Sequence, residues 1–474
     1  MEESFDLVVI GSGPAGEKGA AQAAYFGKRV VVIESSPVPG GTPASTGGMP
    51  TKAIREAALY LTGFRRREVY GIGLDLPPEI SLDRIRARAE EVVRLTIDTV
   101  RENLDRHGIE LIRGQARLRA DHSILVRSET ERVLRGEVVL IATGSRPFRP
   151  ATVPFDDPDV EDSESILELD RIPGSLVVVG GGPVGYEYAS IYAALGVDVV
   201  LVDAGERLLP FMDAEISGLL ATAFAAVGMR LVLGRGVATI ARQEGKLAVT
   251  LADGEILRPE KVLFAAGRAG NTEDLGLDES GIKMDDRGRI VVDDRYRTSA
   301  EGVYAAGDVI GPPALASVSM EQARVAVCLA FDIPFKETVD PLAPYGVYSI
   351  PEVGMAGVTE EAAGGGGIDY EVGRGWFAQN ARARIAGTTD GLVKLVFRRE
   401  DRKLLGVHVM GDIASELVHI GQGVMHADGT IDRFIDTTFN VPTYAEAFKY
   451  AAYDGLQRLG GRPRSAVVAD GPTR

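Results

Sequence analysis

Continuous apolar runs separated by glycine-rich turns mark the start of the chain. Leu7–Ile10 and Val30–Ile33 each have the length and the unbroken apolar character of a strand that is buried on both faces. Glycines follow the first run, and the residues that lead to the second run suit a helix. The pattern therefore predicts a strand, a tight turn, a helix and a second strand over residues 6–34.

The turn of this first element carries Gly11, Gly13 and Gly16 in the order G-x-G-x-x-G. The first glycine allows a sharp turn, the second lets the backbone approach a pyrophosphate, and the third lets the helix pack close to the strand. The N–H groups at the start of the helix then face the phosphates. Glu34 ends the second strand, where its carboxylate can accept hydrogen bonds from both hydroxyls of an adenosine ribose. The combination predicts a dinucleotide-binding unit, since a glycine turn in an ordinary α/β domain needs no acid at this place.

The same arrangement recurs in the middle of the chain. Leu176–Val179 is the strand, Gly180, Gly182 and Gly185 form the turn, and the next strand ends at Asp203. Two such units in one chain predict two dinucleotides, of which one is held permanently and one is exchanged.

The acid that ends the second unit bears on the choice of nucleotide. A carboxylate at Asp203 accepts a hydrogen bond from the free 2′-hydroxyl of NAD and repels the 2′-phosphate of NADP. Glu206 adds to that repulsion, whereas Arg207 can partly offset it. The pattern favours NAD(H), with NADP(H) as the second option.

The charge balance restricts the partners of the chain. Its 52 basic and 68 acidic residues give a net charge of −16, which argues against a nucleic acid or an anionic membrane as a partner. The N-terminus lacks the basic region of a signal peptide, and no apolar run reaches the ~18–20 residues that span a bilayer. Cys328 is the single cysteine, so no intrachain disulfide can form. We expect a cytoplasmic protein without a metal site.

From about residue 341 the pattern changes to one of α+β type. It predicts strands at Leu392–Phe397 and Leu404–Met410 and a helix at Ile413–His426. The segment 461–474 is rich in glycine, proline, arginine and alanine, and we expect it to be a disordered tail.

The loop at residues 40–52 resembles the active-site loop of the pyridine nucleotide-disulfide oxidoreductases, the group of lipoamide dehydrogenase and glutathione reductase. In that family two cysteines stand in the motif G-G-T-C-x-x-x-x-C-x-P-[ST]-K, and here Pro43 and Gly48 take their places. Val441 likewise replaces the family's histidine in His-Pro-Thr-x-x-Glu, although Glu446 remains. The resemblance implies that the thiols and the acid/base that serves them have been lost together.

The resemblance implies an α/β fold class with two Rossmann-like dinucleotide-binding domains, for FAD and for NAD, plus an α+β C-terminal dimerisation domain. The FAD domain is expected to be discontinuous, at residues 1–150 and 269–340. The NAD(P) domain then covers residues 151–268, and the dimerisation domain covers residues 341–460. A homodimer is the expected assembly.

The resemblance also implies roles for individual residues. Lys52 and Glu187 match the pair that lies beside the flavin N5 near the nicotinamide, and Glu446 would act across the dimer interface, so these three are the predicted catalytic residues. The residues predicted to bind FAD are Gly11, Gly13, Pro14, Ala15, Gly16, Glu34, Gly41, Thr42, Gly48, Lys52, Ala142, Thr143, Gly144, Gly307, Asp308 and Ala316. The residues predicted to bind NAD are Gly180, Gly182, Pro183, Val184, Gly185, Glu187, Asp203 and Gly267.

Within the family, four segments resemble the soluble pyridine nucleotide transhydrogenases, namely Arg55–Leu61, Leu208–Asp213, Tyr370–Gly387 and Thr437–Thr443. That branch moves hydride between nicotinamides through FAD alone. The expected function is that of an FAD-dependent NAD(P)H oxidoreductase, which passes hydride from NADH through the flavin to a small electron acceptor in a ping-pong sequence, without a redox disulfide.

Two other functions stay open. An NADH-dependent quinone or dye reductase, or an oxidase, would use the same donor site, and Asp203 favours this class. A non-catalytic sensor or scaffold that binds FAD and NAD would not need Lys52 and Glu187. For the catalytic functions we expect the missing side chain at Gly48 to leave the opposite flavin face less covered, so that an acceptor can enter there.

Overall fold

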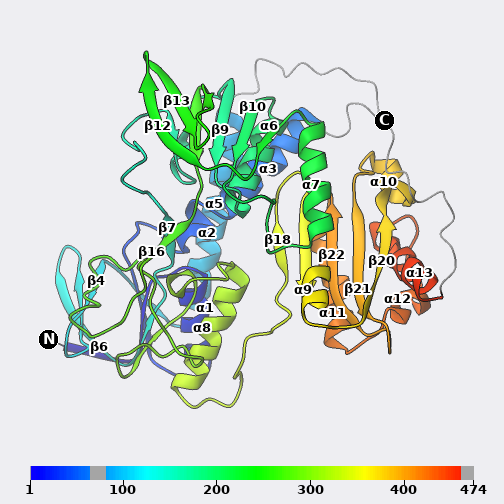
Figure 1. Ribbon diagram of the computed structural model, residues 1–474. Helices are drawn as coiled ribbons and strands as arrows, with labels where there is room; N and C mark the ends of the chain where they lie inside the picture. Colours follow the sequence, from blue (N-terminus) through cyan, green and yellow to red (C-terminus); the bar gives the residue numbers. More distant parts are fainter. Residues whose placement is uncertain (1, 64–81, 461–474) are drawn as a thin grey trace. The chain divides into compact units, whose positions relative to one another are not determined.

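The computed structural model describes residues 2–63 and 82–460. The described residues fall into two compact units, one within residues 1–61, 76–185 and 237–340 and the other within residues 62–75, 186–236 and 341–474 (Figure 1). Helix α6 (Pro183–Ala194) begins in the first unit and continues in the second.

A seven-stranded sheet is the centre of the first unit. Its strands are β1 (Glu2–Ile10), β2 (Val30–Glu34), β3 (Glu110–Arg113), β4 (Gln115–Leu118), β5 (Ile124–Arg127), β6 (Glu131–Ile141) and β17 (Val303–Ala305). They lie in the order β3-β2-β1-β6-β5-β4, with β17 also paired to β6. β1, β2, β3, β6 and β17 are parallel, whereas β4 and β5 form antiparallel pairs at the other edge.

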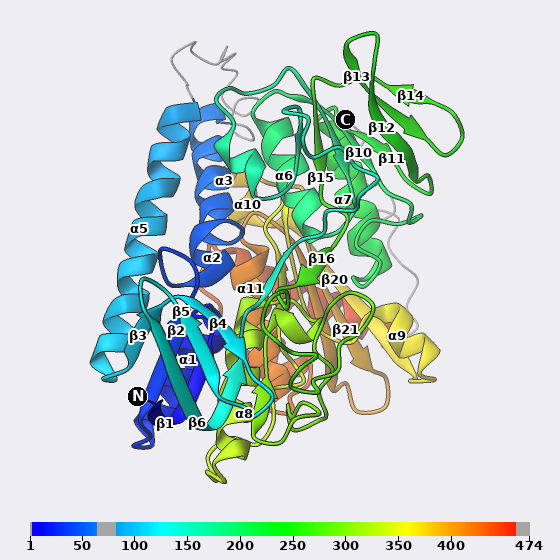
Figure 2. The same ribbon diagram turned by 90° about the vertical axis from the view of Figure 1, so that its left-hand side faces the viewer.

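Apolar side chains cover both faces of this sheet, as its unbroken apolar strands require. On one face Leu7, Val9 and Val32 pack against helices α1 (Pro14–Tyr25), α5 (Leu82–Arg106) and α8 (Ala316–Ala330). On the other face Val8 and Ile10 belong to a core that includes the segment around Ile290. Figure 2 shows α1 lying against β1 and β2, so the helix starts at the edge where these parallel strands end.

Smaller sheets complete the first unit. Parallel strands β8 (Val160–Glu161), β15 (Lys261–Phe264) and β9 (Ser175–Val179) pair side by side. The antiparallel strands are β12 (Val237–Gln243) with β13 (Lys246–Leu251) and β14 (Ile256–Leu257), and β7 (Ser145–Pro147) with β16 (Arg268–Gly270). Two short helices of the unit, α2 (Gly41–Ser45) and α3 (Met49–Thr62), follow the first dinucleotide turn.

The second unit contains a parallel pair and an antiparallel sheet. β10 (Asp198–Val202) pairs in parallel with β11 (Arg230–Val232), and helix α7 (Ala214–Ala226) lies between them in the chain. The antiparallel sheet has the order β18 (Tyr345–Val347), β19 (Glu352–Gly357), β22 (Leu404–Gly411), β21 (Leu392–Arg398) and β20 (Tyr370–Trp376). The accompanying helices are α9 (Glu360–Gly365), α10 (Ala381–Ala386), α11 (Ala414–His426), α12 (Asp432–Asp436) and α13 (Ala447–Leu459).

Helix α13 lies directly on strand β20 because two glycines of that strand lack side chains. A Cβ atom at Gly373 would lie 2.0 Å from the carbonyl oxygen of Ala451, and one at Gly375 would lie 2.1 Å from that of Ala447. Phe397, Phe434 and the other apolar side chains of this core then fill the space between helices and sheet.

The predicted fold class is confirmed in both units. The strand, turn, helix and strand expected over residues 6–34 are β1, α1 and β2, and the expected α+β region is the antiparallel sheet with α11 and α13. The predicted domain limits stay a prediction, and the segment 461–474 lies outside the described residues. Over residues 2–63 and 82–460, no helix has both the length and the apolar character needed to cross a membrane.

Candidate functional site

The first glycine turn is a close crossing of backbone segments. Gly11 has a φ of +101°, and a Cβ atom there would lie 2.4 Å from the carbonyl oxygen of Ala142 at the end of β6. A Cβ atom at Gly16 would lie only 1.8 Å from the carbonyl oxygen of Gly11. Gly13 is the N-cap of α1 and supplies no side chain to cap it. The first N–H groups of α1 are therefore available to an anion.

Glu34 is fixed against this turn rather than extended into solvent. Its Oε2 atom accepts hydrogen bonds from the main-chain N (2.9 Å) and the Oγ (2.6 Å) of Ser12, and its Oε1 atom accepts one from the main-chain N of Ser36 (2.8 Å). Ser12 Oγ in turn accepts a hydrogen bond from the main-chain N of Gly40 (3.1 Å). The carboxylate is thus held at the ends of β1 and β2. Its remaining lone pairs can accept hydrogen bonds from hydroxyl groups.

Two more glycine segments converge on the start of α1. Gly41 has a φ of +62°, and a Cβ atom there would lie 2.8 Å from the Cα atom of Gly13. Gly307 has a φ of +83°, and a Cβ atom there would lie 3.0 Å from the Cβ atom of Ala15. Side chains at these positions would fill the space beside the helix N-terminus, so the glycines leave a cradle of main-chain groups that fits a pyrophosphate.

Polar contacts tie the remaining predicted residues of the first unit together. Asp308 accepts hydrogen bonds from Ser145 Oγ (2.8 Å) and Ser319 Oγ (3.3 Å), and Ser145 Oγ accepts one from Arg268 Nε (2.8 Å). Thr143 Oγ1 donates to the carbonyl oxygen of Asn271 (2.7 Å). The predicted turn at 142–144 and the predicted residue Asp308 are therefore brought together with Ser145 and Arg268, which sequence reasoning missed although each directly follows a recognised turn.

The loop that has lost its cysteines is closed at the point where the second thiol would stand. A Cβ atom at Gly48 would lie 2.6 Å from the Cα atom of Pro43 and 2.7 Å from its carbonyl oxygen. A side chain at position 48 would therefore meet the backbone of Pro43, and the expectation that the flavin face beside Gly48 is less covered stays a prediction. Lys52 lies in the first turn of α3, whose start is stabilised by a hydrogen bond of 2.8 Å from Thr51 Oγ1 to the carbonyl oxygen of Gly48.

Cys328 lies in α8 with 1% of its surface exposed, and burial raises the pKa of its thiol. A buried thiol of raised pKa is an unreactive packing residue.

The second glycine turn repeats the geometry of the first. Gly180 has a φ of +114°, and a Cβ atom there would lie 2.7 Å from the carbonyl oxygen of Ala265. A Cβ atom at Gly185 would lie 2.0 Å from the carbonyl oxygen of Gly180. Gly182 has open space around its Cα atom, and Pro183 and Val184 form the first turn of α6.

Asp203 and Arg207 follow strand β10 in the second unit. Asp203 Oδ1 accepts a hydrogen bond from the main-chain N of Gly205 (2.7 Å). Arg207 donates to Glu361 Oε1 (3.1 Å) and to the carbonyl oxygens of Pro210 (2.5 Å) and Met212 (3.1 Å). Its guanidinium is therefore engaged along its own loop and with Glu361, and the preference of Asp203 for a 2′-hydroxyl stays a prediction.

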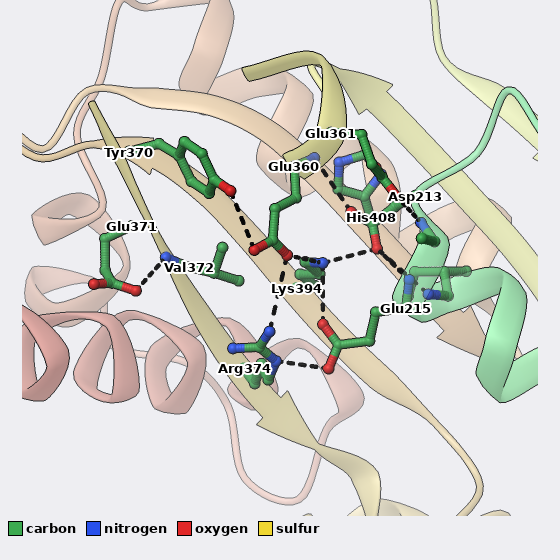
Figure 3. A network of polar contacts seen from close by, with 12 residues as sticks. Asp213, Glu215, Glu360, Glu361, Tyr370, Glu371, Val372, Arg374, Lys394 and His408 are labelled. Atoms are coloured by element: carbon green, nitrogen blue, oxygen red, sulfur yellow. Dashed lines mark hydrogen bonds and ion pairs between the residues drawn. The ribbon is translucent and has the colours of Figure 1, made fainter. Parts of the chain in front are cut away.

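A buried cluster of charges holds the other end of this loop (Figure 3). Lys394 Nζ lies 2.8 Å from Asp213 Oδ1, 3.0 Å from Glu215 Oε2 and 2.6 Å from Glu360 Oε2, and only 1% of the Lys394 side chain is exposed. Arg374 Nε lies 2.7 Å from Glu215 Oε1. Since Asp213 also caps α7 by accepting hydrogen bonds from Glu215 N and Ile216 N, the cluster fixes the start of that helix to strand β21.

The protonation of the cluster follows from its partners. Burial alone would lower the pKa of Lys394, but the hydrogen bonds to Asp213 and Glu360 raise it above its ordinary value. Burial alone would raise the pKa of Asp213, but its hydrogen bonds with Lys394 and with the main-chain N of Glu360 lower it. Burial lowers the pKa of His408, which is fully buried and whose Nε2 atom lies 3.0 Å from the carbonyl oxygen of Val358. The lysine is thus charged, and His408 is a neutral residue of the core.

The predicted catalytic glutamates differ in their surroundings. Glu187 is 8% exposed, and its Oε1 atom accepts a hydrogen bond from the main-chain N of Tyr348 (3.0 Å). Glu446 Oε1 accepts a hydrogen bond from Tyr450 OH (3.2 Å), and the charge of Glu446 raises the pKa of Tyr450. Val441, in place of the family histidine, is 60% exposed.

Comparisons with known proteins agree over nearly the whole chain. The family described as pyridine nucleotide-disulphide oxidoreductase matches residues 5–327, and its dimerisation domain matches residues 343–452. The soluble pyridine nucleotide transhydrogenase of Mycobacterium tuberculosis is 42% identical over 96% of this chain and 98% of its own length. That of Chromohalobacter salexigens is 40% identical over 96% of this chain and 99% of its own length.

Two solved structures share the fold. LpdA from Mycobacterium tuberculosis has a TM-score of 0.87 at 28% identity, covering 95% of this chain and 99% of its own. The HOCl-induced flavoprotein disulfide reductase RclA from Escherichia coli, in its Cu(II) complex, has a TM-score of 0.86 at 29% identity with the same coverage.

The closed loop makes a steric prediction. Gly48→Ala places a Cβ atom against the backbone of Pro43, so we expect a loss of about 1–3 kcal/mol of stability and weaker retention of flavin. Thermal unfolding and the ratio of flavin to protein absorbance measure both. Gly218→Ala in α7, where a Cβ atom meets nothing within 4 Å, is the matched control. Unchanged stability and flavin content in Gly48→Ala would contradict the closed loop.

The buried cluster makes a prediction with a defined pH dependence. Lys394→Met removes the ammonium group that Asp213, Glu215 and Glu360 share and leaves Glu215 and Glu360 with Arg374, and we expect a loss of about 3–5 kcal/mol at pH 7. The parent's stabilisation from Asp213 and Glu215, whose pKa values are lowered, is present above their unfolded values and is lost as the pH falls through the folded ones. The deficit of the variant should therefore shrink on acidification.

Denaturant unfolding between pH 7 and pH 4 tests this prediction. Lys403→Met, which removes the exposed ion pair with Asp428, is the control and should change stability by about 0–1 kcal/mol. A Lys394→Met deficit that stays constant or grows as the pH falls would show that the carboxylates are not held ionised by the lysine.

Proposed function

The chain belongs to the pyridine nucleotide-disulphide oxidoreductase family, and on that premise we propose which of its residues carry the reaction. It is an FAD-dependent NAD(P)H oxidoreductase of the soluble transhydrogenase type, and its single cysteine is consistent with a reaction that uses no redox disulfide. The observation that carries the proposal is the pairing of two intact dinucleotide turns with a thiol-free loop that is closed between Pro43 and Gly48.

We assign FAD to the first turn. The N-terminus of α1, with Gly13, Pro14 and Ala15, would hold the pyrophosphate. Glu34 would accept hydrogen bonds from the hydroxyls of the adenosine ribose. The remaining proposed FAD contacts come from Gly11, Gly16, Gly41, Thr42, Gly48, Lys52, Ala142, Thr143, Gly144, Gly307, Asp308 and Ala316. Bound FAD would supply the hydride chemistry, since it can take a hydride from one nicotinamide nucleotide and give it to an acceptor.

The second turn would hold the exchangeable nucleotide. Gly180, Gly182, Pro183, Val184, Gly185 and Gly267 are its proposed main-chain contacts. Asp203 would accept a hydrogen bond from the 2′-hydroxyl of NADH. The engagement of Arg207 with Glu361 supports NADH as the hydride donor. Lys52 and Glu187 would set the charge distribution where the hydride is transferred.

Two kinds of electron acceptor are compatible with this donor site. The likeness to transhydrogenases favours a second nicotinamide nucleotide. Asp203 favours instead an NADH-dependent quinone or dye reductase, because its carboxylate repels a 2′-phosphate. The matched dimerisation domain indicates a homodimer, in which we propose that Glu446 acts toward the partner subunit. The cytoplasmic location expected from the sequence stays a prediction.

Electron counting tests the absence of a redox disulfide. Anaerobic titration with dithionite should need two electrons per chain, because the flavin is the only redox group that the proposal includes. Cys328→Ser should give the same count, since that thiol is buried. An uptake of four electrons per chain would contradict the proposal.

Nucleotide choice tests the role of Asp203. Asp203→Asn removes the charge and keeps the shape, so we expect the ratio of kcat/KM for NADPH to that for NADH to rise about tenfold, which corresponds to about 1.4 kcal/mol. Asp198→Asn, at the opposite end of β10, is the control and should leave the ratio unchanged. An unaltered ratio in Asp203→Asn would show that this carboxylate does not face the 2′ position.

A further inference from the structure

The short segment that connects strands β18 and β19 of the second unit contacts helix α6. The main-chain N of Tyr348 donates to Glu187 Oε1 (3.0 Å), and the main-chain N of Ile350 donates to Ser190 Oγ (3.1 Å). Ser190 Oγ itself donates to the carbonyl oxygen of Glu187 (2.9 Å). The hydroxyl of Ser190 therefore links Ile350 of the segment to Glu187, which precedes Ser190 by one helical turn.

The two acceptors lie on one face of the helix. On a helix the residues i and i+3 share a face, as Glu187 and Ser190 do. The chain bends at residues 349–351 as it passes from β18 to β19, and the N–H groups of Tyr348 and Ile350 both meet that face.

The hydrogen bond between Ile350 and Ser190 is buried. Ser190 and Ile350 are each 2% exposed and Ser349 is fully buried, whereas Tyr348 is half-buried beside Glu187, which is 8% exposed. A buried main-chain N–H group such as that of Ile350 costs free energy when it loses its acceptor.

The segment is also anchored on its far side. Ser349 Oγ donates to the carbonyl oxygen of Pro351 (2.6 Å), and Glu352 Oε2 accepts hydrogen bonds from the N (3.2 Å) and the Oγ (2.7 Å) of Ser415 in α11. Strands β18 and β19 flank it on either side and pair with each other. The sheet and Ser415 therefore hold the two ends of the segment, and the hydroxyl of Ser190 holds Ile350 between them.

We propose that Ser190 is a positioning residue for Glu187. By holding Ile350 it fixes the segment on α6, and the segment then fixes the carboxylate of Glu187 through Tyr348. The inference rests on the role in hydride transfer that is proposed above for Glu187. Without the hydroxyl of Ser190, Ile350 loses its acceptor, the segment loosens, and the carboxylate loses its fixed orientation.

The test combines a structural and a kinetic measurement. Ser190→Ala should speed amide hydrogen exchange in the peptide that contains Tyr348 and Ile350. It should also slow anaerobic bleaching of the flavin at saturating NADH roughly fivefold, the effect of losing about one hydrogen bond, while KM for NADH changes less than twofold. Ser217→Ala is the matched control, because the Ser217 hydroxyl is equally buried in α7 and has no hydrogen-bond partner among the described residues. Neither quantity should change in it.

A double-mutant cycle separates positioning from a general loss of stability. In a Glu187→Gln background, Ser190→Ala should slow flavin bleaching no further, because the carboxylate it positions is already gone. An equal slowing in both backgrounds would overturn the inference and leave the proposed role of Glu187 intact. Full-speed bleaching in Glu187→Gln alone would overturn both.

A second variant keeps the inference falsifiable if Ser190→Ala does not fold. Ser190→Cys replaces the hydroxyl by a weaker hydrogen-bonding group and should shift exchange and bleaching in the same direction. Unchanged exchange at Tyr348 and Ile350 in either folded variant would show that the hydroxyl does not hold the segment.

Discussion

The structure depends on two places where the backbone crosses itself too closely for any side chain. A Cβ atom at Gly16 would lie 1.8 Å from the carbonyl oxygen of Gly11, and one at Gly185 would lie 2.0 Å from that of Gly180. Such contacts exclude every residue except glycine, and they bring each helix close against its strand. The strand end, the turn and the helix N-terminus then form one rigid surface of main-chain N–H groups. Nucleotide binding by this chain follows from that geometry.

The second determinant of function is the loss of the family's two thiols and its histidine. Pro43 and Gly48 replace the two thiols, and the backbone of Pro43 fills the place of a side chain at 48. Val441 replaces a histidine, and Glu446 accepts a hydrogen bond from Tyr450. The loop is therefore not a damaged disulfide site, and the remaining chemistry is hydride transfer between nucleotide and flavin.

Sequence reasoning succeeded where the signal is local. The turns at Gly11 and Gly180 and the runs of β21 and β22 are contained in short segments, and each follows from chain geometry. It failed where partners lie far apart in the sequence. Lys394 with Asp213 and Ser190 with Ile350 join segments separated by 181 and 160 residues, and no periodicity marks such pairs. The close approach of Gly48 to Pro43 likewise depends on the path of the backbone, which residue identity alone does not give.

The most direct test of hydride transfer without a thiol is anaerobic and uses a second nucleotide. The bound flavin is first reduced with one equivalent of NADH, and the enzyme is then mixed rapidly with thio-NADP⁺ or with a quinone. The account predicts that NADH bleaches the flavin and that one of the two acceptors reoxidises it rapidly, with one acceptor molecule reduced per flavin; thio-NADP⁺ as that acceptor identifies a transhydrogenase and the quinone alone a reductase. Failure of NADH to bleach the flavin, or a reduced flavin that neither acceptor reoxidises, would contradict it.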